Sequence, residues 1–211
     1  MRKSRRFKVK AKPTYAVVVD GETEVWYLQM LKRNERKISV SIEPRIPQKK
    51  SVTEQFEMVC KLAIDYTTVF WIVDLDVIIK ETREAKRGAI TPLQQFINYR
   101  KKTEEIENII TIVNNPCIEF WFLLHFEKTK KLYNDCSSAE RQLKKHIKNY
   151  TKSRKFFTAE NNDIYLKLKP NLKEAIKNAK AFDDFDDQNP TRAICEMDLF
   201  FETKLLKVLT Q

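Results

Sequence analysis

Acidic residues follow three short apolar segments of this chain, residues 15–19, 69–73 and 109–113. Each segment is rich in valine, isoleucine or aromatic residues, which is typical of a buried strand. The carboxyl ends of parallel strands meet at the same edge of a sheet, so we expect these acids to lie close together. Carboxylate oxygens are the ligands that Mg²⁺ prefers in proteins. The sequence therefore predicts a divalent-metal site at that edge.

Asp74 and Asp76 are separated by one residue at the end of the middle segment. In extended backbone two such side chains point to the same side, and their charges repel unless a cation lies between them. The preceding segment is so apolar that Asp74 is expected in or near the core, where a bare carboxylate is costly. These features favour metal binding over a simple turn.

The other acids have a simpler interpretation when each is considered alone. Asp20 and Glu24 flank the start of a predicted helix, and Glu119 lies in the first turn after Pro116. Acidic residues stabilise the positive end of a helix dipole whether or not a metal is present. Their coincidence at three strand ends favours a shared site.

Gly21 stands directly after the first predicted strand and is one of two glycines in the chain. Average composition would give a chain of this length about 15 glycines. We therefore expect Gly21 to supply a backbone conformation that other residues adopt poorly.

Cysteine and histidine are too scattered in the sequence to form a zinc site. The four cysteines are Cys60, Cys117, Cys136 and Cys195. Without a CxxC pair among them, they are expected to be free or buried thiols in a reducing compartment rather than disulfides. His125 is six residues after Glu119, so the two do not share a helical face. We expect it to be a core histidine or a donor to a site residue.

The charge of the chain favours a polyanionic partner, above all nucleic acid. The 211 residues carry a formal net charge of +11, and lysine and arginine are concentrated in residues 2–12 and 128–155. A lysine-rich solvated surface would give the same excess. Lys144, Lys145 and Lys148, on one predicted helix, are the candidate phosphate contacts.

The chain shows no apolar run near the about 18 residues that a membrane span requires. Its basic N-terminus lacks the apolar segment of a signal peptide, so a cytoplasmic protein without a membrane partner is expected. The basic arm, residues 1–13, either contacts phosphates or is a solvated tail.

Strand and helix patterns alternate over residues 14–126, which predicts an α/β core with a mostly parallel sheet flanked by helices. Strands are expected at 15–19, 38–46, 69–73 and 109–113, and helices at 24–34, 51–66, 91–102 and from Asn115-Pro116 onward. Residues 127–211 are expected to form a strand-free helical extension packed on the core, with helices at 138–149, 170–182 and 191–204.

Several motifs resemble those of known families. Residues 17–24, Val-Val-Val-Asp-Gly-Glu-Thr-Glu, followed by Tyr27, resemble the first motif of the Toprim domain, and Asp74-Leu75-Asp76 resembles its DxD motif. Residues 115–126, Asn-Pro-Cys-Ile-Glu-Phe-Trp-Phe-Leu-Leu-His-Phe, are similar to the signature of the RloB-like family. Asn189-Pro190-Thr191 resembles the closing element of that family.

This resemblance implies a Toprim-like fold and phosphodiester chemistry that depends on Mg²⁺ or Mn²⁺. It implies Asp20, Asp74 and Asp76 as metal ligands, and Asp20, Glu24 and Glu119 as catalytic residues. It also implies a role in bacterial anti-phage defence by abortive infection and an AAA-type ATPase partner. In one departure, this chain has Asp20 where Toprim proteins generally have glutamate, which is longer by one methylene.

Two classes of function follow from these observations. The first is a Mg²⁺-dependent Toprim nuclease, or nuclease-like effector, that acts on nucleic-acid phosphodiesters. The second is a non-enzymatic nucleic-acid-binding or sensor subunit that works through the ATPase. Restoring glutamate at position 20 distinguishes them, because only the first predicts a gain of activity. Nucleotidyl transfer is less favoured, since no nucleotide-triphosphate loop is evident in the sequence.

Overall fold

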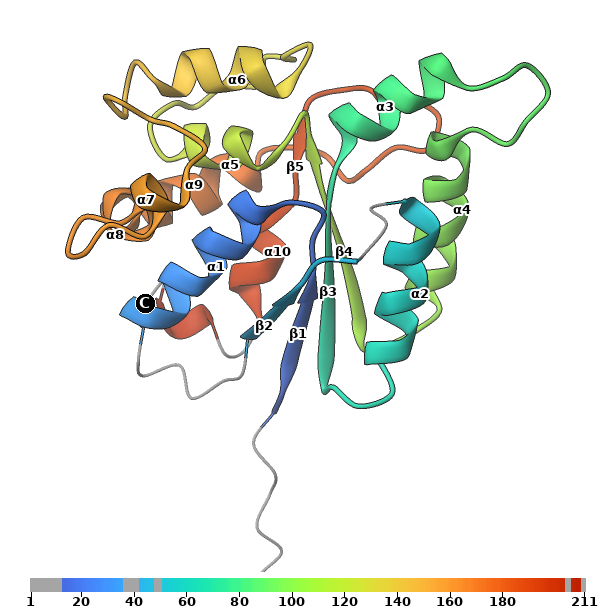
Figure 1. Ribbon diagram of the computed structural model, residues 1–211, viewed down its shortest axis with the longest axis horizontal. Helices are drawn as coiled ribbons and strands as arrows, with labels where there is room; N and C mark the ends of the chain where they lie inside the picture. Colours follow the sequence, from blue (N-terminus) through green and yellow to red (C-terminus); the bar gives the residue numbers. More distant parts are fainter. Residues whose placement is uncertain (1–12, 36–41, 48–50, 204–205, 210–211) are drawn as a thin grey trace, which may run out of the picture.

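The computed structural model describes residues 13–35, 42–47, 51–203 and 206–209. Its centre is a five-stranded sheet with the order β2-β1-β3-β4-β5 (Figure 1). The predicted basic arm, residues 1–13, lies outside the described residues except for Pro13.

The sheet is parallel except at one edge. The strands are β1 (Tyr15–Val18), β2 (Ile42–Arg45), β3 (Thr68–Asp74), β4 (Ile109–Asn115) and β5 (Ile194–Cys195), and only the pairing of β4 with β5 is antiparallel. Phe70 and Ile72 pack into one buried cluster, whereas Trp71 and Val73 pack into another on the opposite face. A strand covered on both faces needs an apolar residue at every position, as residues 69–73 provide.

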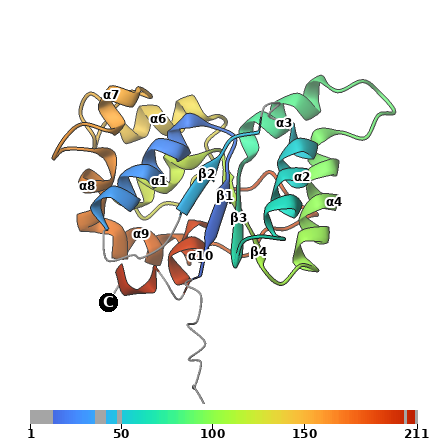
Figure 2. The same cartoon turned by 60° about the horizontal axis from the view of Figure 1, so that its bottom comes forward.

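Helices cover both faces of the sheet, as Figure 2 shows. On one side lie α2 (Val52–Leu62) and α4 (Pro92–Glu104), with the buried side of α3 (Leu75–Glu84). On the other lie α1 (Glu22–Asn34), α5 (Ile118–Leu124) and α10 (Met197–Glu202). The side chains of Ser51 and Thr91 cap α2 and α4 by accepting hydrogen bonds from backbone N–H groups.

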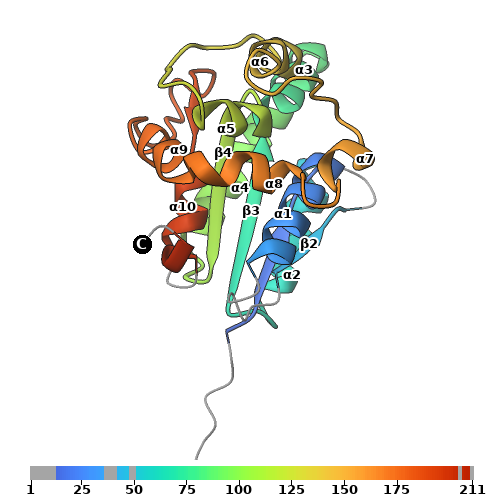
Figure 3. The same cartoon turned by 90° about the vertical axis from the view of Figure 1, so that its left-hand side faces the viewer.

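The C-terminal part of the chain is mostly helical and shares a core with the sheet. Its helices are α6 (Cys136–Leu143), α7 (Arg154–Phe157), α8 (Ile164–Leu168), η1 (Lys169–Asn171), α9 (Leu172–Ala179), α10 and η2 (Lys207–Leu209). Tyr150 and Phe157 are buried in the same cluster as Tyr27 of α1 and Phe122 of α5. Figures 1 and 3 place α6 beside α3, at the end of the molecule where β1 and β3 run into their helices.

The predicted α/β class, a mostly parallel sheet flanked by helices, is confirmed, and the arrangement is consistent with a Toprim-like fold. The prediction that the C-terminal extension has no strand is wrong. The segment 191–204, which was predicted to be a helix, contains β5 followed by α10. Glu196 fixes this segment beside β4: its carboxylate accepts a hydrogen bond from Val113 N and pairs with both terminal nitrogens of Arg100.

Several predicted helices have different bounds, and two of these differences affect candidate site residues. The helix expected over 138–149 ends at Leu143. The helix expected from Asn115-Pro116 begins at Ile118, with Cys117 at its N-cap, because Asn115 is the last residue of β4. The Asn115 amide donates to the carbonyl oxygens of Thr191 and Arg192 instead of capping a helix. In the part of the chain that is described, no helix has the length and apolar character needed to cross a bilayer.

Candidate metal centre and acidic cleft

Three carboxylates meet where β1 and β3 end. Asp20 follows β1, Glu24 lies in the first turn of α1, and Asp74 is the last residue of β3. Oxygens of the three side chains all lie within 4.8 Å of one another. We call Asp20, Glu24 and Asp74 the acidic trio. The parallel order of β1 and β3 is what brings these distant residues to one edge.

Burial and mutual repulsion make the charged form of the trio costly. Glu24 is only 3% exposed and Asp74 only 8%. Burial first, and then the nearby charges of Asp20 and Glu119, raise the pKa of Glu24 to about 8. Burial, followed by the charges of Glu24 and Asp20, raises the pKa of Asp74 well above its usual value. A hydrogen bond of 3.1 Å from Ile118 N to Asp74 Oδ2 offsets part of that cost.

The trio has the features of a cation site. Among the described residues, the buried Glu24 Oε2 has no hydrogen-bond partner, and neither has the buried Asn114 Oδ1 beside Asp74. Gly21 is extended, with φ −131° and ψ 159°, so the expected need for unusual backbone freedom is wrong. Gly21 instead leaves room for the Glu24 side chain, because a Cβ at this position would collide with Glu24 Oε2. An all-oxygen set with an open lone pair fits Mg²⁺ or Mn²⁺.

Asp76 lies outside the trio. The predicted extended backbone through the DxD motif is wrong, because α3 begins at Leu75 and turns Asp76 away from Asp74. Asp76 Oδ2 accepts a hydrogen bond of 3.2 Å from Cys136 N, and Oδ1 accepts one of 2.8 Å from Val77 N. Burial raises the pKa of Asp76, and these two N–H groups lower it in part. Asp76 therefore joins α3 to the start of α6.

Glu119 is fully buried and has a cation of its own. Its Oε1 accepts hydrogen bonds from Tyr150 Oη at 2.8 Å and from Lys152 Nζ at 2.9 Å. Burial alone would lower the pKa of Lys152, but the charges of Glu119, Asp74 and Glu24 raise it. The sequence pointed to neither Tyr150 nor Lys152, since both lie more than thirty residues beyond Glu119 in a segment with no motif.

A disulfide joins Cys117 to Cys136 beside Glu119. The prediction of free thiols is wrong for this pair and right for Cys60 and Cys195. The two bonded sulfurs lie 3.0 and 2.8 Å from Glu119 Oε2 but carry no proton to donate. They also lack the thiolate that binds metals, so the acidic trio is the better metal site.

These residues line an open cleft of about 510 Å³ that we call the acidic cleft. Its lining includes the acidic trio, Asp76, the Cys117–Cys136 disulfide and Lys152. The side chain of Lys152 is 40% exposed, so its ammonium is accessible from the cleft although it pairs with Glu119. The cleft therefore combines cation ligands with a basic group.

The remaining predicted residues lie elsewhere. Lys145 lines a separate hollow, Lys144 pairs with Glu140 at 2.7 Å, and Lys148 is exposed. The prediction that the three share a helix is wrong, because α6 ends at Leu143, before all of them. His125 is buried, with Nδ1 3.0 Å from Trp121 O, and burial lowers its pKa to about 4. It is a neutral core histidine.

Comparison with protein families finds one relationship for most of this chain. A family model described as RloB-like protein matches residues 15–203. Comparisons with curated proteins and with solved structures each found no match. The matched segment contains the acidic trio, Asp76, Glu119 and the whole of the helical C-terminal part up to residue 203.

Proposed function

This chain belongs to the RloB-like family, and from that premise we propose that its acidic cleft hydrolyses nucleic-acid phosphodiesters with Mg²⁺ or Mn²⁺. The observation that carries the proposal is the acidic trio, in which a buried Glu24 oxygen has no hydrogen-bond partner. Buried carboxylates in this state are stabilised by a divalent cation, and oxygen ligands of this kind are common to phosphoryl-transfer sites.

The residues of the cleft divide the work of hydrolysis. Asp20, Glu24 and Asp74 would hold the cation, which when bound would lower the pKa of a water and offset charge on the phosphate. Without metal, the raised pKa of Glu24, about 8, lets it hold a proton near neutral pH, and cation binding would displace that proton. Lys152 presents a positive charge to a phosphate oxygen, because its ammonium is partly exposed in the cleft. Water attacks phosphorus, the bond from phosphorus to the leaving ester oxygen breaks, and the proton lost by the water ends on that leaving oxygen.

The test is cleavage of labelled single-stranded and duplex oligonucleotides in Mg²⁺, in Mn²⁺ and in EDTA. We expect cleavage only with metal, and its loss in Asp74→Asn, which removes a ligand charge at constant size. Glu160→Gln, at an exposed glutamate outside the cleft, is the matched control and should cleave as the wild type does. Metal-independent cleavage, or equal activity of Asp74→Asn, would contradict the proposal.

A second candidate function rests on Asp20. Its side chain is shorter than the glutamate of Toprim proteins, which suits a non-enzymatic nucleic-acid-binding or sensor subunit with a degenerate site. Asp20→Glu separates the two functions. In a nuclease it should raise the cleavage rate, whereas in a sensor subunit it should leave the oligonucleotide intact. Metal binding measured by titration calorimetry shows whether the ligands are assembled in either case.

The family also suggests a setting for this activity. We propose that the protein acts in the cytoplasm in bacterial anti-phage defence by abortive infection, with an AAA-type ATPase as partner. Nucleic acid is the polyanion that suits the net charge of +11. Co-purification with an ATPase encoded nearby, with and without phage infection, tests the partnership. Growth of cells expressing Asp74→Asn tests whether the cleft is required for defence.

A further inference from the structure

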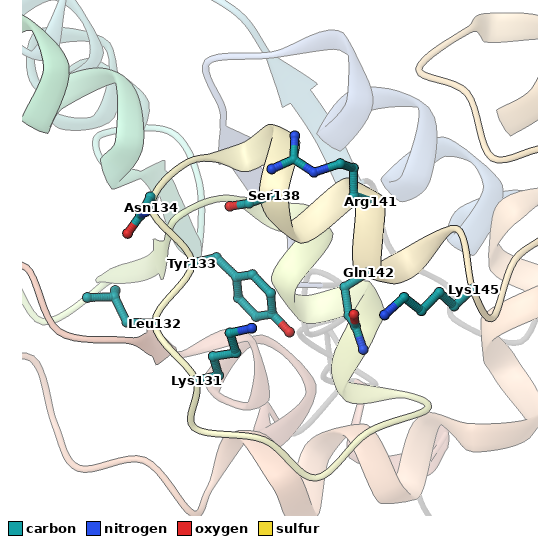
Figure 4. A pocket seen from close by; sticks show the side chains of 8 residues that line it. All are labelled: Lys131, Leu132, Tyr133, Asn134, Ser138, Arg141, Gln142 and Lys145. Carbon is teal, nitrogen blue, oxygen red and sulfur yellow. The ribbon is translucent and has the colours of Figure 1, made fainter.

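A second, positively charged hollow lies beside the acidic cleft. It has a volume of about 430 Å³ and is lined from α6 and the segment before it. We call it the cationic hollow. Lys131, Arg141 and Lys145 contribute its charge, and Tyr133, Ser138 and Gln142 contribute polar groups. Figure 4 shows the side chains of Lys131, Gln142 and Lys145 ending around the hydroxyl end of Tyr133.

The charge of the cationic hollow is available to a ligand. Within the described part of the chain no acidic side chain lines it, and its three cations form no ion pair there. Asp135 and Glu127 lie near it and interact with the charges of Arg141 and Lys145, respectively, although neither forms an ion pair with them. Asp135 caps α6 through Ser138 N at 2.7 Å. Glu127 accepts hydrogen bonds from Gln142 and His146.

A middle hollow of about 700 Å³ connects the cationic hollow to the acidic cleft. It shares Leu132, Tyr133 and Asn134 with the cationic hollow, and Asp76 and Val77 with the acidic cleft. The three hollows therefore form one continuous surface between α3 and α6. These two helices begin close together, at the same end of the molecule, and run apart from there (Figure 1).

The middle hollow adds features that suit a polymer rather than a small anion. Lys80 and Arg83 of α3 line it together with Asp76 and Asp135, so cationic side chains are present between the two outer hollows although acids accompany them. Leu132 is 47% exposed where the middle and cationic hollows meet, which offers an apolar surface for a sugar or base. A single small phosphate would be satisfied by one hollow. A strand with regularly spaced phosphates fits all three.

We propose that the cationic hollow binds a backbone phosphate of the same nucleic-acid strand whose scissile phosphate enters the acidic cleft. This inference rests on the proposed function for the role of the cleft, but the binding itself needs no metal and no cleavage. Lys131, Arg141 and Lys145 hold the strand at a fixed distance from the acidic trio. The hollow therefore sets where along the strand the cleft acts.

The test uses a labelled 20-nucleotide single-stranded DNA in EDTA, with affinity followed by fluorescence anisotropy from 50 to 200 mM salt. Lys131→Glu/Lys145→Glu should weaken binding at low salt by at least about tenfold and reduce the salt slope by about 1 to 2. The matched control is Lys173→Glu/Lys177→Glu, which makes the same charge change on α9, away from the three hollows. It should bind within about twofold of the wild type, as long-range charge effects are screened.

Arg141→Gln provides an independent variant that removes charge without reversing it, and it should weaken binding in the same direction. Equal affinity of the hollow variant and the α9 control would overturn the inference. So would displacement of the oligonucleotide by millimolar inorganic phosphate, because the hollow would then be a site for free anions. Circular dichroism melts establish that each variant is folded.

The outcomes also separate this inference from the proposed nuclease activity. If the wild type binds the strand through the cationic hollow but does not cleave it with Mg²⁺ or Mn²⁺, the proposed nuclease function fails. The inference that the hollow binds a backbone phosphate then still holds. If cleavage occurs and the hollow variant binds and cleaves as the wild type does, the binding path fails and the nuclease stands. Where both hold, the hollow variant should lose affinity for the strand, and its cleavage positions on a bound strand should become less uniform.

Discussion

Glu24 and Glu119 occupy equivalent places in the chain but opposite electrostatic environments. Each lies in the first turn of a helix that follows a parallel strand, and each is almost completely buried. Glu24 faces two other carboxylates and leaves one oxygen without a partner. Glu119 faces Tyr150 and Lys152, which come from the C-terminal part of the chain.

The difference between the two glutamates shows how a fold can leave a buried carboxylate able to bind a ligand. The protein supplies the counter-charge for Glu119 itself, so that position is complete without a ligand. For the acidic trio, burial and mutual repulsion still raise the pKa of Glu24 and of Asp74, and Glu24 Oε2 has no hydrogen-bond partner among the described residues. The trio therefore differs from Glu119 in having room for a ligand, which is the basis of the metal site that we propose.

The largest expected effect comes from a substitution in the acidic trio. Asp74→Asn removes one charge from the trio and should lower the metal-dependent cleavage rate more than about 100-fold, since loss of one charge-stabilising group has that effect in enzymes. Stability without metal should stay level or rise, because like-charge repulsion is relieved. Cleavage assays and urea denaturation measure the two quantities. A large loss of stability would instead identify Asp74 as a structural partner in the core.

The Cys117–Cys136 disulfide is a covalent cross-link beside Glu119. Cys117 and Cys136 are 19 residues apart, and a cross-link of this span stabilises a protein by about 3 kcal/mol. Reduction, or Cys117→Ser/Cys136→Ser, should lower the free energy of unfolding by up to that amount. Urea melts with and without dithiothreitol measure it. Cys60→Ser is the control, because Cys60 is a free thiol, and it should retain the full effect of reduction.

Lys152→Met removes the internal cation from Glu119. We expect a loss of about 2 kcal/mol, less than for a fully buried pair because the ammonium is partly exposed. Adding Glu119→Gln to Lys152→Met should restore most of the loss, since no buried charge then lacks a partner. Chemical denaturation of the two single variants and the double variant gives the coupling energy. If the losses simply add, Glu119 does not depend on Lys152.

The smallest expected effect, per pH unit, is the change in stability that accompanies titration of Glu24 in the acidic trio. The pKa of Glu24 is raised from 4.5 to about 8 in the folded protein, so the folded state holds more protons than the unfolded state between these values. The metal-free protein should therefore lose stability as the pH rises through this window, by up to about 1.4 kcal/mol per unit for one proton. Thermal melts from pH 4.5 to 8 measure this slope.

Mg²⁺ should reverse that pH dependence, because the cation binds the deprotonated trio and competes with the protons. Glu24→Gln should flatten the slope without metal and abolish the response to Mg²⁺. A slope that persists unchanged in Glu24→Gln would show that the titrating group lies outside the trio.

The acidic trio was largely predictable from the sequence because its members follow strands whose apolar patterns are clear. Residues 15–19 and 69–73 are apolar at every position, which indicates buried parallel strands, and parallel strands place their carboxyl ends together. Asp76 was placed incorrectly because the pattern could not show that α3 begins immediately after Asp74. The end of a strand is decided by contacts on both sides of it.

Tertiary structure alone decided how each carboxylate is balanced. The sequence by itself determined the four parallel strands, the helices between them and the edge where acids gather, since these depend on the periodicity of apolar residues over short segments, whereas β5 was missed. Lys152, Tyr150 and Cys136 reach Glu119 from positions 17 to 33 residues away, along a chain whose path no local pattern specifies. Ion pairs, disulfides and hollows depend on where distant segments pack. That packing gives Glu119 a partner in Lys152 and leaves one oxygen of Glu24 without a hydrogen-bond partner among the described residues.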